Sequence, residues 1–142
     1  MVNSTTESFS AEERAAMKER AKELKSKAKA EDLLKELLAK IAEMPPADRK
    51  LAERIHELVM NAGPGLIPKT WYGMPAYAKG DKVVVFFKGA DKFGERYATL
   101  GFNEPALLDD GSMWPTSYAI TQLTPADEKL VSALVAKAVG SA

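Results

Sequence analysis

The chain contains no cysteine, which excludes disulfides, thiolate metal sites and cysteine nucleophiles. It contains one histidine, so a transition-metal site would have to consist mainly of carboxylates. Its longest strongly apolar run, Val83–Phe87, is far too short to span a membrane. A basic excess is also missing, because 20 Lys and Arg balance 20 Asp and Glu. We therefore expect a protein that binds neither nucleic acid nor membranes.

What is present is typical of a globular protein. The chain has 142 residues, of which 46% are hydrophobic and 28% are charged, and this length corresponds to about one domain. The first ten residues are polar and lack the apolar segment of a secretory signal, so we expect a cytoplasmic location. We predict a disordered tail over residues 1–9 and a single domain over 10–142. Both a monomer and a weak dimer are compatible with this sequence.

The first half of the chain is predicted to be helical. Ser10 and Glu13 have the spacing of a capping box, which starts a helix with a thin apolar stripe. We interpret residues 10–30 as this helix followed by a frayed or linker segment at 25–30. Residues 31–62 form a helical pair, with helices at about 31–43 and 47–62. Gly63 follows the second of them and is expected to be a left-handed C-terminal cap.

The second half is predicted to form a sheet over residues 66–120. The predicted strands are 69–72, 76–79, 82–88, 96–102 and, interrupted by Pro115, 112–120. The strand at 82–88 has an unbroken apolar centre, which places it in the middle of the sheet. Thr124 and Pro125 then begin a closing helix over 124–139. The predicted fold class is α+β, with an antiparallel sheet of four or five strands, N-terminal helices and a C-terminal helix.

Aromatic residues are concentrated in this second half, and basic residues lie among them. A sheet face lined by aromatic rings with cations at its edge could hold an anionic or planar ligand. The alternative is a sheet core whose Tyr and Trp tips reach the surface. The candidate ligand-binding residues are Trp71, Tyr72, Tyr77, Lys88, Arg96, Tyr97 and Trp114.

No pattern predicts catalysis. His56 lies at the edge of the apolar stripe of its helix, and no motif surrounds it, so we interpret it as a boundary or solvent-facing residue. The glycines at 63–65 and 89–94 match no phosphate-binding loop and are read as turns. Glu12 and Glu19 could contribute to a cation-binding ridge, but basic residues interleave with the acidic ones along this helix. Asp109 and Asp110 form an acidic pair with no basic residue between them, in an Asp-Gly sequence that is typical of a turn.

Four segments carry a resemblance to a known family. They are residues 71–77 (WYGMPAY), followed by 80–87, and residues 96–102 followed by 108–116. In these segments the chain resembles the YdhG-like family of small bacterial domains, from about residue 41 to 139. The resemblance implies a frataxin-like arrangement of helices on one face of an antiparallel sheet. Some members are described as intracellular iron chaperones, and the family supplies no catalytic residues to carry over.

Three hypotheses about function follow. The resemblance favours a non-enzymatic binding protein, an iron chaperone among the options, with Asp109, Asp110, Glu12 and Glu19 as the hard ligands available. The aromatic cluster favours a small-molecule binding domain, or an enzyme, that uses the sheet face. A scaffold for protein interactions is the third hypothesis, and an exposed apolar area on the first helix would favour it.

Overall fold

The computed structural model describes residues 10–140, so the predicted tail at residues 1–9 lies outside the described residues. The chain divides into two compact units, residues 1–32 and residues 33–142. Helix α2 (Ala11–Ala42) begins in the first unit and ends in the second. All other helices and strands of the described chain belong to the second unit.

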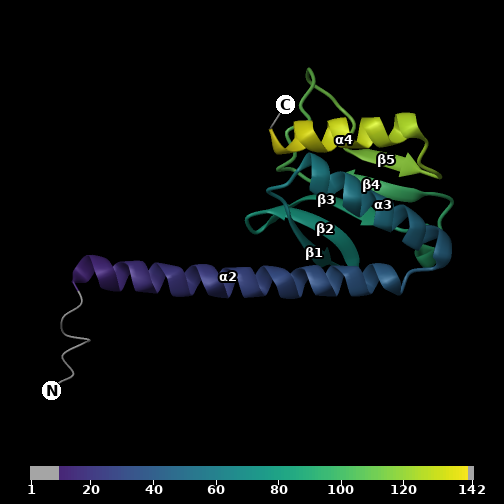
Figure 1. Ribbon diagram of the computed structural model, residues 1–142. Helices are drawn as coiled ribbons and strands as arrows, with labels where there is room; N and C mark the ends of the chain where they lie inside the picture. The colour runs from purple at the N-terminus through teal and green to yellow at the C-terminus, as the bar shows by residue number, and fades with distance from the viewer. Residues whose placement is uncertain (1–9, 141–142) are drawn as a thin grey trace. The chain divides into compact units, whose positions relative to one another are not determined.

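Helix α2 is continuous, as Figure 1 shows, so the linker predicted at residues 25–30 was wrong. The segment Lys25–Ala30 consists of lysine, alanine and one serine, and lysine and alanine have high helix propensity. A thin apolar stripe reduces what a helix can bury, but it does not interrupt the backbone hydrogen bonds. The predicted capping box is confirmed, because the Glu13 amide donates to Ser10 Oγ and the Ser10 amide donates to Glu13 Oε1.

The sheet of the second unit has five strands, and every neighbouring pair is antiparallel. The strands follow chain order: β1 (Ile67–Trp71), β2 (Met74–Lys79), β3 (Lys82–Lys88), β4 (Ala98–Phe102) and β5 (Ser117–Ile120). The predicted central position of β3 is confirmed. A two-residue turn joins β1 to β2, and both of its residues, Tyr72 and Gly73, have positive φ (50° and 76°), as a tight hairpin requires.

Helices α3 (Pro46–Ala62) and α4 (Pro125–Val139) cover one face of this sheet (Figure 1). The core lies between them and that face. It includes the fully buried side chains Leu37, Ile55, Val59, Tyr77, Val85, Phe87, Leu100 and Val135. The predicted α+β class, with N-terminal helices, an antiparallel sheet and a closing helix, is therefore confirmed.

A short 3₁₀ turn, η1 (Asp91–Phe93), follows β3 and is held by a buried carboxylate. Asp48, in the first turn of α3, is 2% exposed and accepts backbone N–H bonds from Ala90, Asp91 and Lys92 at 3.0, 3.1 and 3.0 Å. An unpaired buried charge would be very unfavourable, and these three donors compensate it. Asp48 thereby fixes the connection between β3 and β4 to the start of α3.

Three local predictions need correction. Gly63 has φ −127°, so it is not a left-handed cap; an added Cβ would lie 2.8 Å from Leu66 Cδ1, and space explains the glycine. Strand β4 begins at Ala98 rather than at residue 96, after the left-handed Gly94. Strand β5 begins at Ser117 rather than at 112, because Pro115 cannot donate to a ladder.

Among the described residues, no helix combines the length and the apolar character that crossing a membrane would need.

Candidate functional site

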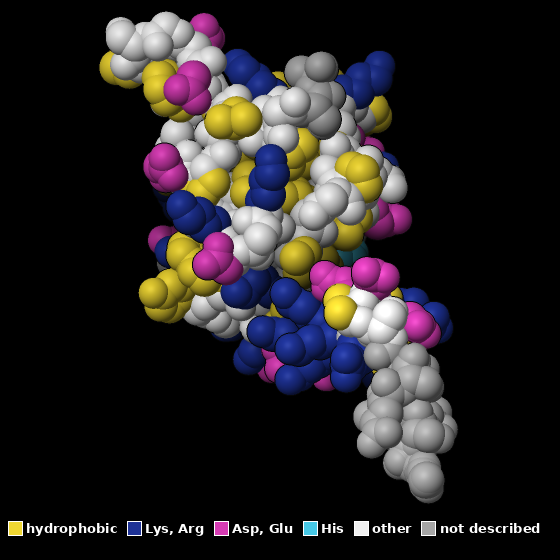
Figure 2. All heavy atoms as spheres, turned by 90° about the vertical axis from the view of Figure 1, so that its left-hand side faces the viewer, with side chains coloured by type: hydrophobic (Ala, Val, Ile, Leu, Met, Phe, Trp, Pro, Cys, Tyr) yellow, Lys and Arg dark blue, Asp and Glu magenta, His cyan; other side chains and the backbone are white. Residues whose placement is uncertain are grey.

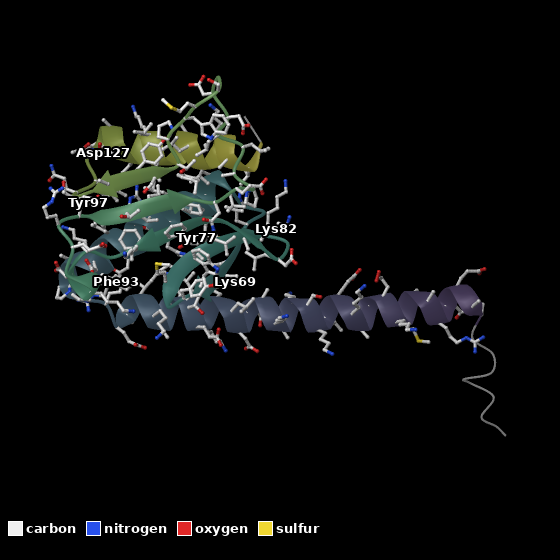
Figure 3. The ribbon with its side chains drawn as sticks, turned by 180° about the vertical axis from the view of Figure 1, so that it is seen from behind. Lys69, Tyr77, Lys82, Phe93, Tyr97 and Asp127 are labelled. Atoms are coloured by element: carbon white, nitrogen blue, oxygen red, sulfur yellow. The ribbon has the colours of Figure 1, made fainter. Side chains whose placement is uncertain are left out.

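The face of the sheet opposite α3 and α4 has no helix of residues 33–140 over it (Figure 3). We call it the open face. Side chains alternate across a strand, and Val85 and Phe87 point into the core, so Phe86 and Lys88 point to the open face. The register places Lys69, Ala76 and Gly101 in one row with Phe86 across four strands. Ala76 and Gly101 are small, so the side chains of Lys69 and Phe86 project above them on the open face.

Trp71 lies at the centre of an aromatic cluster on the open face. Its ring centroid is 5.2 Å from that of Phe86 and 4.9 Å from that of Tyr72. Tyr72 is 83% exposed, while Trp71 and Phe86 are half-buried. The Phe86 ring occupies the space above Gly101, where an added Cβ would overlap it. These neighbours hold the Trp71 ring in place and leave part of its surface free to contact a ligand.

Two lysines gather at the η1 end of this cluster. Lys88 Nζ lies 5.0 Å from the centre of the Phe93 ring and 3.1 Å from Glu95 Oε1. Lys92 Nζ lies 5.5 Å from the same ring. Ammonium groups over an aromatic face are stabilised by the ring quadrupole, and Lys88 has a carboxylate partner as well. This end of the open face therefore presents two cations, of which one is neutralised in part.

A groove opens on the other side of Trp71. We call it the Trp71 groove; it is shallow and open to solvent, with a volume of about 460 Å³. Figure 3 labels Lys69 on β1 and Lys82 at the start of β3, both of which line it. The complete lining is Lys69, Trp71, Asp81, Lys82, Val83, Asn103, Glu104 and Pro105.

The Trp71 groove offers both signs of charge in unpaired form. Among the described residues, no ion pair within 4.0 Å involves Lys69, Lys82, Asp81 or Glu104. The backbone N–H of Asn103 donates a hydrogen bond to the Val84 carbonyl at 2.9 Å. The groove can thus offer an indole surface, two ammonium donors and two carboxylate acceptors to one ligand. The residues that line the groove include no serine, threonine or histidine, so they offer no nucleophile paired with a histidine base.

The structure brings three of the predicted ligand-binding residues together on the open face: Trp71, Tyr72 and Lys88. Tyr77 is elsewhere, because it is fully buried on the helix side, and its hydroxyl is 2.9 Å from His56 Nδ1. Burial raises the pKa of Tyr77 and lowers that of His56. His56 is therefore a half-buried partner of a core tyrosine and not a purely solvent-facing residue.

The other predicted aromatic and basic residues lie outside both clusters. Arg96 and Tyr97 are exposed just before β4, with Arg96 Cζ 5.3 Å from the centre of the Tyr97 ring. Trp114 is half-buried and packs against the hydrophobic core. The aromatic residues predicted as one group thus divide between the core and the surface of the protein.

The predicted iron ligands do not form a cluster. Asp109 and Asp110 are exposed in a turn of the second unit, and Glu12 and Glu19 are exposed on α2 in the first unit. Within residues 10–140, no group of three or more His, Asp or Glu side chains could hold a metal ion. Hard cations prefer several oxygen ligands, and each unit by itself supplies only two of these carboxylates.

Sequence reasoning missed Lys69, Lys82 and Asn103 as parts of the groove. Lys69 and Trp71 are two residues apart on β1, and residues two apart in a strand lie on the same face, so this pairing could have been predicted from the sequence. Lys82 and Asn103 come close to them only through the pairing of β2, β3 and β4.

No family model, curated protein or solved structure matched this chain when it was compared with each of the three.

Proposed function

We propose that this protein is a non-enzymatic binding domain for a small, planar ligand that carries an anionic group. The observation that supports the proposal is the position of Trp71 between an aromatic cluster and a groove that contains two unpaired lysines. The proposal follows the interpretation of the aromatic residues as a ligand platform. No contact among the described residues favours iron binding over it.

The indole of Trp71 supplies the surface for a planar ring. The rings of Phe86 and Tyr72 pack against the indole, so ligand binding needs little reorganisation of the Trp71 rotamer. A ring stacked on the indole buries apolar area at a low entropic cost, because the platform is already ordered.

The lysines supply the charge preference. Lys69 is half-buried on the same strand as Trp71, and Lys82 begins the central strand β3. A carboxylate or phosphate on the ligand would pair with Lys69 and Lys82. Asp81 and Glu104 would accept hydrogen bonds from ligand donors, which favours a ligand with both an anionic and a donor group over inorganic phosphate.

A fluorescence titration tests this function. In Trp114→Phe, Trp71 is the only tryptophan, so its emission reports on the groove. Adenosine monophosphate and benzoate represent planar anions, adenosine and benzamide are their neutral counterparts, and inorganic phosphate is the anion without a ring. We expect saturable quenching by one or both planar anions, weaker quenching by the neutral compounds and none by phosphate. A flat response to every planar anion would refute the proposal.

Lysine variants test whether the planar anion binds in the Trp71 groove. Lys69→Gln and Lys82→Gln should each weaken binding of the planar anion about five- to tenfold and leave the neutral compounds unaffected. Lys129→Gln on α4 makes the same charge change at an exposed residue outside the groove and should have no effect. Equal losses in all three variants would show a non-specific charge effect. An anaerobic titration with ferrous iron in the same protein tests the iron hypothesis, and saturable heat would favour that alternative.

A further inference from the structure

The N-terminal part of α2 separates charges that are interleaved in the sequence. Residues 11–29 contain seven basic and four acidic side chains. At about 100° per residue, five of the basic ones fall within an arc of about 80°. We call these the basic row, and it consists of Arg14, Lys18, Lys22, Lys25 and Lys29. Figure 2 looks at α2 from its N-terminal end and shows Lys and Arg side chains gathered on one side.

An apolar row lies directly beside the basic row. Met17, Ala21, Leu24 and Ala28 occupy an adjacent arc of about 60°. Met17 is 47% exposed and Leu24 is 59% exposed, although side chains of these types are usually buried. Within residues 11–31, every residue in the combined arc of about 160° is basic or apolar.

The acidic residues occupy the rest of the helix surface. Glu12, Glu19 and Glu23 lie opposite the centre of the combined arc, and Glu13 is engaged with Ser10 in the capping box. No ion pair within 4.0 Å involves the basic row in the described part of the chain. The interleaved sequence suggested that these charges nearly cancel, whereas the continuous helix separates them by face.

We propose that the combined basic and apolar face of α2 binds to the surface of an anionic lipid bilayer. The basic row extends along about 22 Å of the helix axis, at 1.5 Å per residue. A helix that lies in the plane of a bilayer surface inserts its apolar row and directs lysines towards lipid headgroups. Anionic lipids match both rows, whereas a nucleic acid duplex would leave Met17 and Leu24 without an apolar partner.

The inference is independent of the ligand proposed for the Trp71 groove. It concerns a helix lying on a membrane surface and not one crossing it, in agreement with the finding on membrane-spanning helices. With two large apolar side chains in the row, the binding would be reversible and strongly dependent on lipid charge.

Sedimentation of the full chain with vesicles tests the proposal. Vesicles of equal parts phosphatidylglycerol and phosphatidylcholine should bind the protein, and vesicles of phosphatidylcholine alone should not. Sodium chloride at 0.5 M should release it, because the headgroup attraction is screened. Absence of sedimentation with the anionic vesicles at low salt would overturn the proposal.

Two matched double variants distinguish binding by the basic row from an effect of the overall net charge. Lys18→Gln with Lys25→Gln removes two charges from the basic row, and Arg20→Gln with Lys27→Gln removes two from outside it. At roughly a fivefold loss for each cation near the surface, the first should weaken binding about 25-fold, and the second about twofold or less. Leu24→Ser should also weaken vesicle binding, while circular dichroism confirms that helix content is retained in each variant.

The outcomes distinguish the alternatives. Equal losses of vesicle binding in the two double variants would refute binding by this face of α2, because net charge alone would then explain the result. Tighter binding to a DNA duplex than to the vesicles, with no effect of Leu24→Ser, would refute a lipid surface in favour of nucleic acid.

Discussion

His56 Nδ1 lies 2.9 Å from the hydroxyl oxygen of Tyr77, and the two ring centroids are 5.7 Å apart. The pair joins α3 to β2 across the core. Because Tyr77 is fully buried, its hydroxyl needs a partner inside the protein, and His56 is the one that the structure provides. The lone histidine of this chain therefore has a structural role that its position on the helix alone does not show.

The first prediction concerns this pair and pH. Burial lowers the pKa of His56 in the folded state, so the unfolded chain takes up a proton at a higher pH than the folded one. The free energy of unfolding should fall as pH is lowered from 7 through the unfolded pKa of about 6.5. His56→Leu should lose this pH dependence between pH 7 and 5.5. It should also lose about 1–3 kcal/mol at pH 7, because the Tyr77 hydroxyl is left without a partner.

Urea denaturation followed by circular dichroism at pH 7 and 5.5 measures both effects. Tyr77→Phe is the matched control, because it removes the unpartnered hydroxyl together with its hydrogen bond and should cost less than His56→Leu. A wild-type protein whose stability is equal at the two pH values would contradict the argument.

The second prediction concerns Asp48. Asp48→Ala removes the acceptor of three backbone N–H groups, and we expect a loss of roughly 3 kcal/mol in the free energy of unfolding. Asp48→Asn retains the shape but directs an amide N–H₂ group towards one of the donors, so it should also destabilise. Hydrogen exchange at the amides of residues 90–92 should accelerate in both. Asp91→Asn, at an exposed side chain, is the control, and an Asp48→Asn protein as stable as this control would be inconsistent with the role assigned here.

The third prediction concerns the contact of Phe86 with Gly101. An added Cβ at Gly101 would overlap the Phe86 ring, so Gly101→Ala should displace that ring and with it the Trp71 indole. We expect a loss of about 1–3 kcal/mol and a shift in Trp71 emission in the Trp114→Phe background. Combining Gly101→Ala with Phe86→Ala removes the overlap, so the two changes together should cost less than the sum of each alone. Strict additivity would argue against the overlap.

The fourth prediction concerns the link between α3 and α4. Arg54 on α3 donates to both carboxylate oxygens of Glu128 on α4, at 2.7 and 2.9 Å. These bonds lower the pKa of Glu128, so their contribution to stability is present at neutral pH and is lost as pH falls through the folded pKa, which lies below the usual pKa of a glutamate. Glu128→Gln should therefore destabilise modestly at pH 7 and have a smaller effect at pH 3. Salt should reduce the difference at pH 7, because both groups are partly exposed.

Thermal denaturation at low and high salt provides the measurement. Glu57 also lies 3.4 Å from Arg54, but its contact is weaker and more exposed, so Glu57→Gln serves as the comparison. If both variants lowered the melting temperature equally, the bidentate contact would not be the dominant one.

Part of the fold follows from local patterns in the sequence. The apolar run Val83–Phe87 indicated a central strand, and Thr124 with Pro125 marked the start of α4, whose capping box the structure contains. These features depend on neighbours in the chain, and their physical rules are short-range. The segment predicted as frayed or linker at residues 25–30 lies inside a continuous helix, because its lysines and alanines have high helix propensity.

The candidate site was predictable only in part. The aromatic and basic composition of residues 71–118 indicated a ligand platform or a core, and Trp71, Tyr72 and Lys88 do meet on the open face. Tyr77 was assigned to the same cluster, but the alternation of β2 turns it to the helix side. Asn103 and Lys82 are brought to Trp71 by strand pairing between residues far apart in the chain, which no local pattern encodes.

The sequence by itself determined the α+β class, the central position of β3 and the helix starts at Ser10 and Thr124. Each follows from hydrogen bonding and side-chain burial within a few residues. The tertiary structure alone decided which aromatic rings are core and which are surface, that Asp48 holds the η1 turn, and that His56 serves Tyr77. The meaning of the zero net charge changed at the level of secondary structure, because the continuous helix α2 sorts charges by angle and not by their order in the sequence. A neutral chain can therefore carry a basic face.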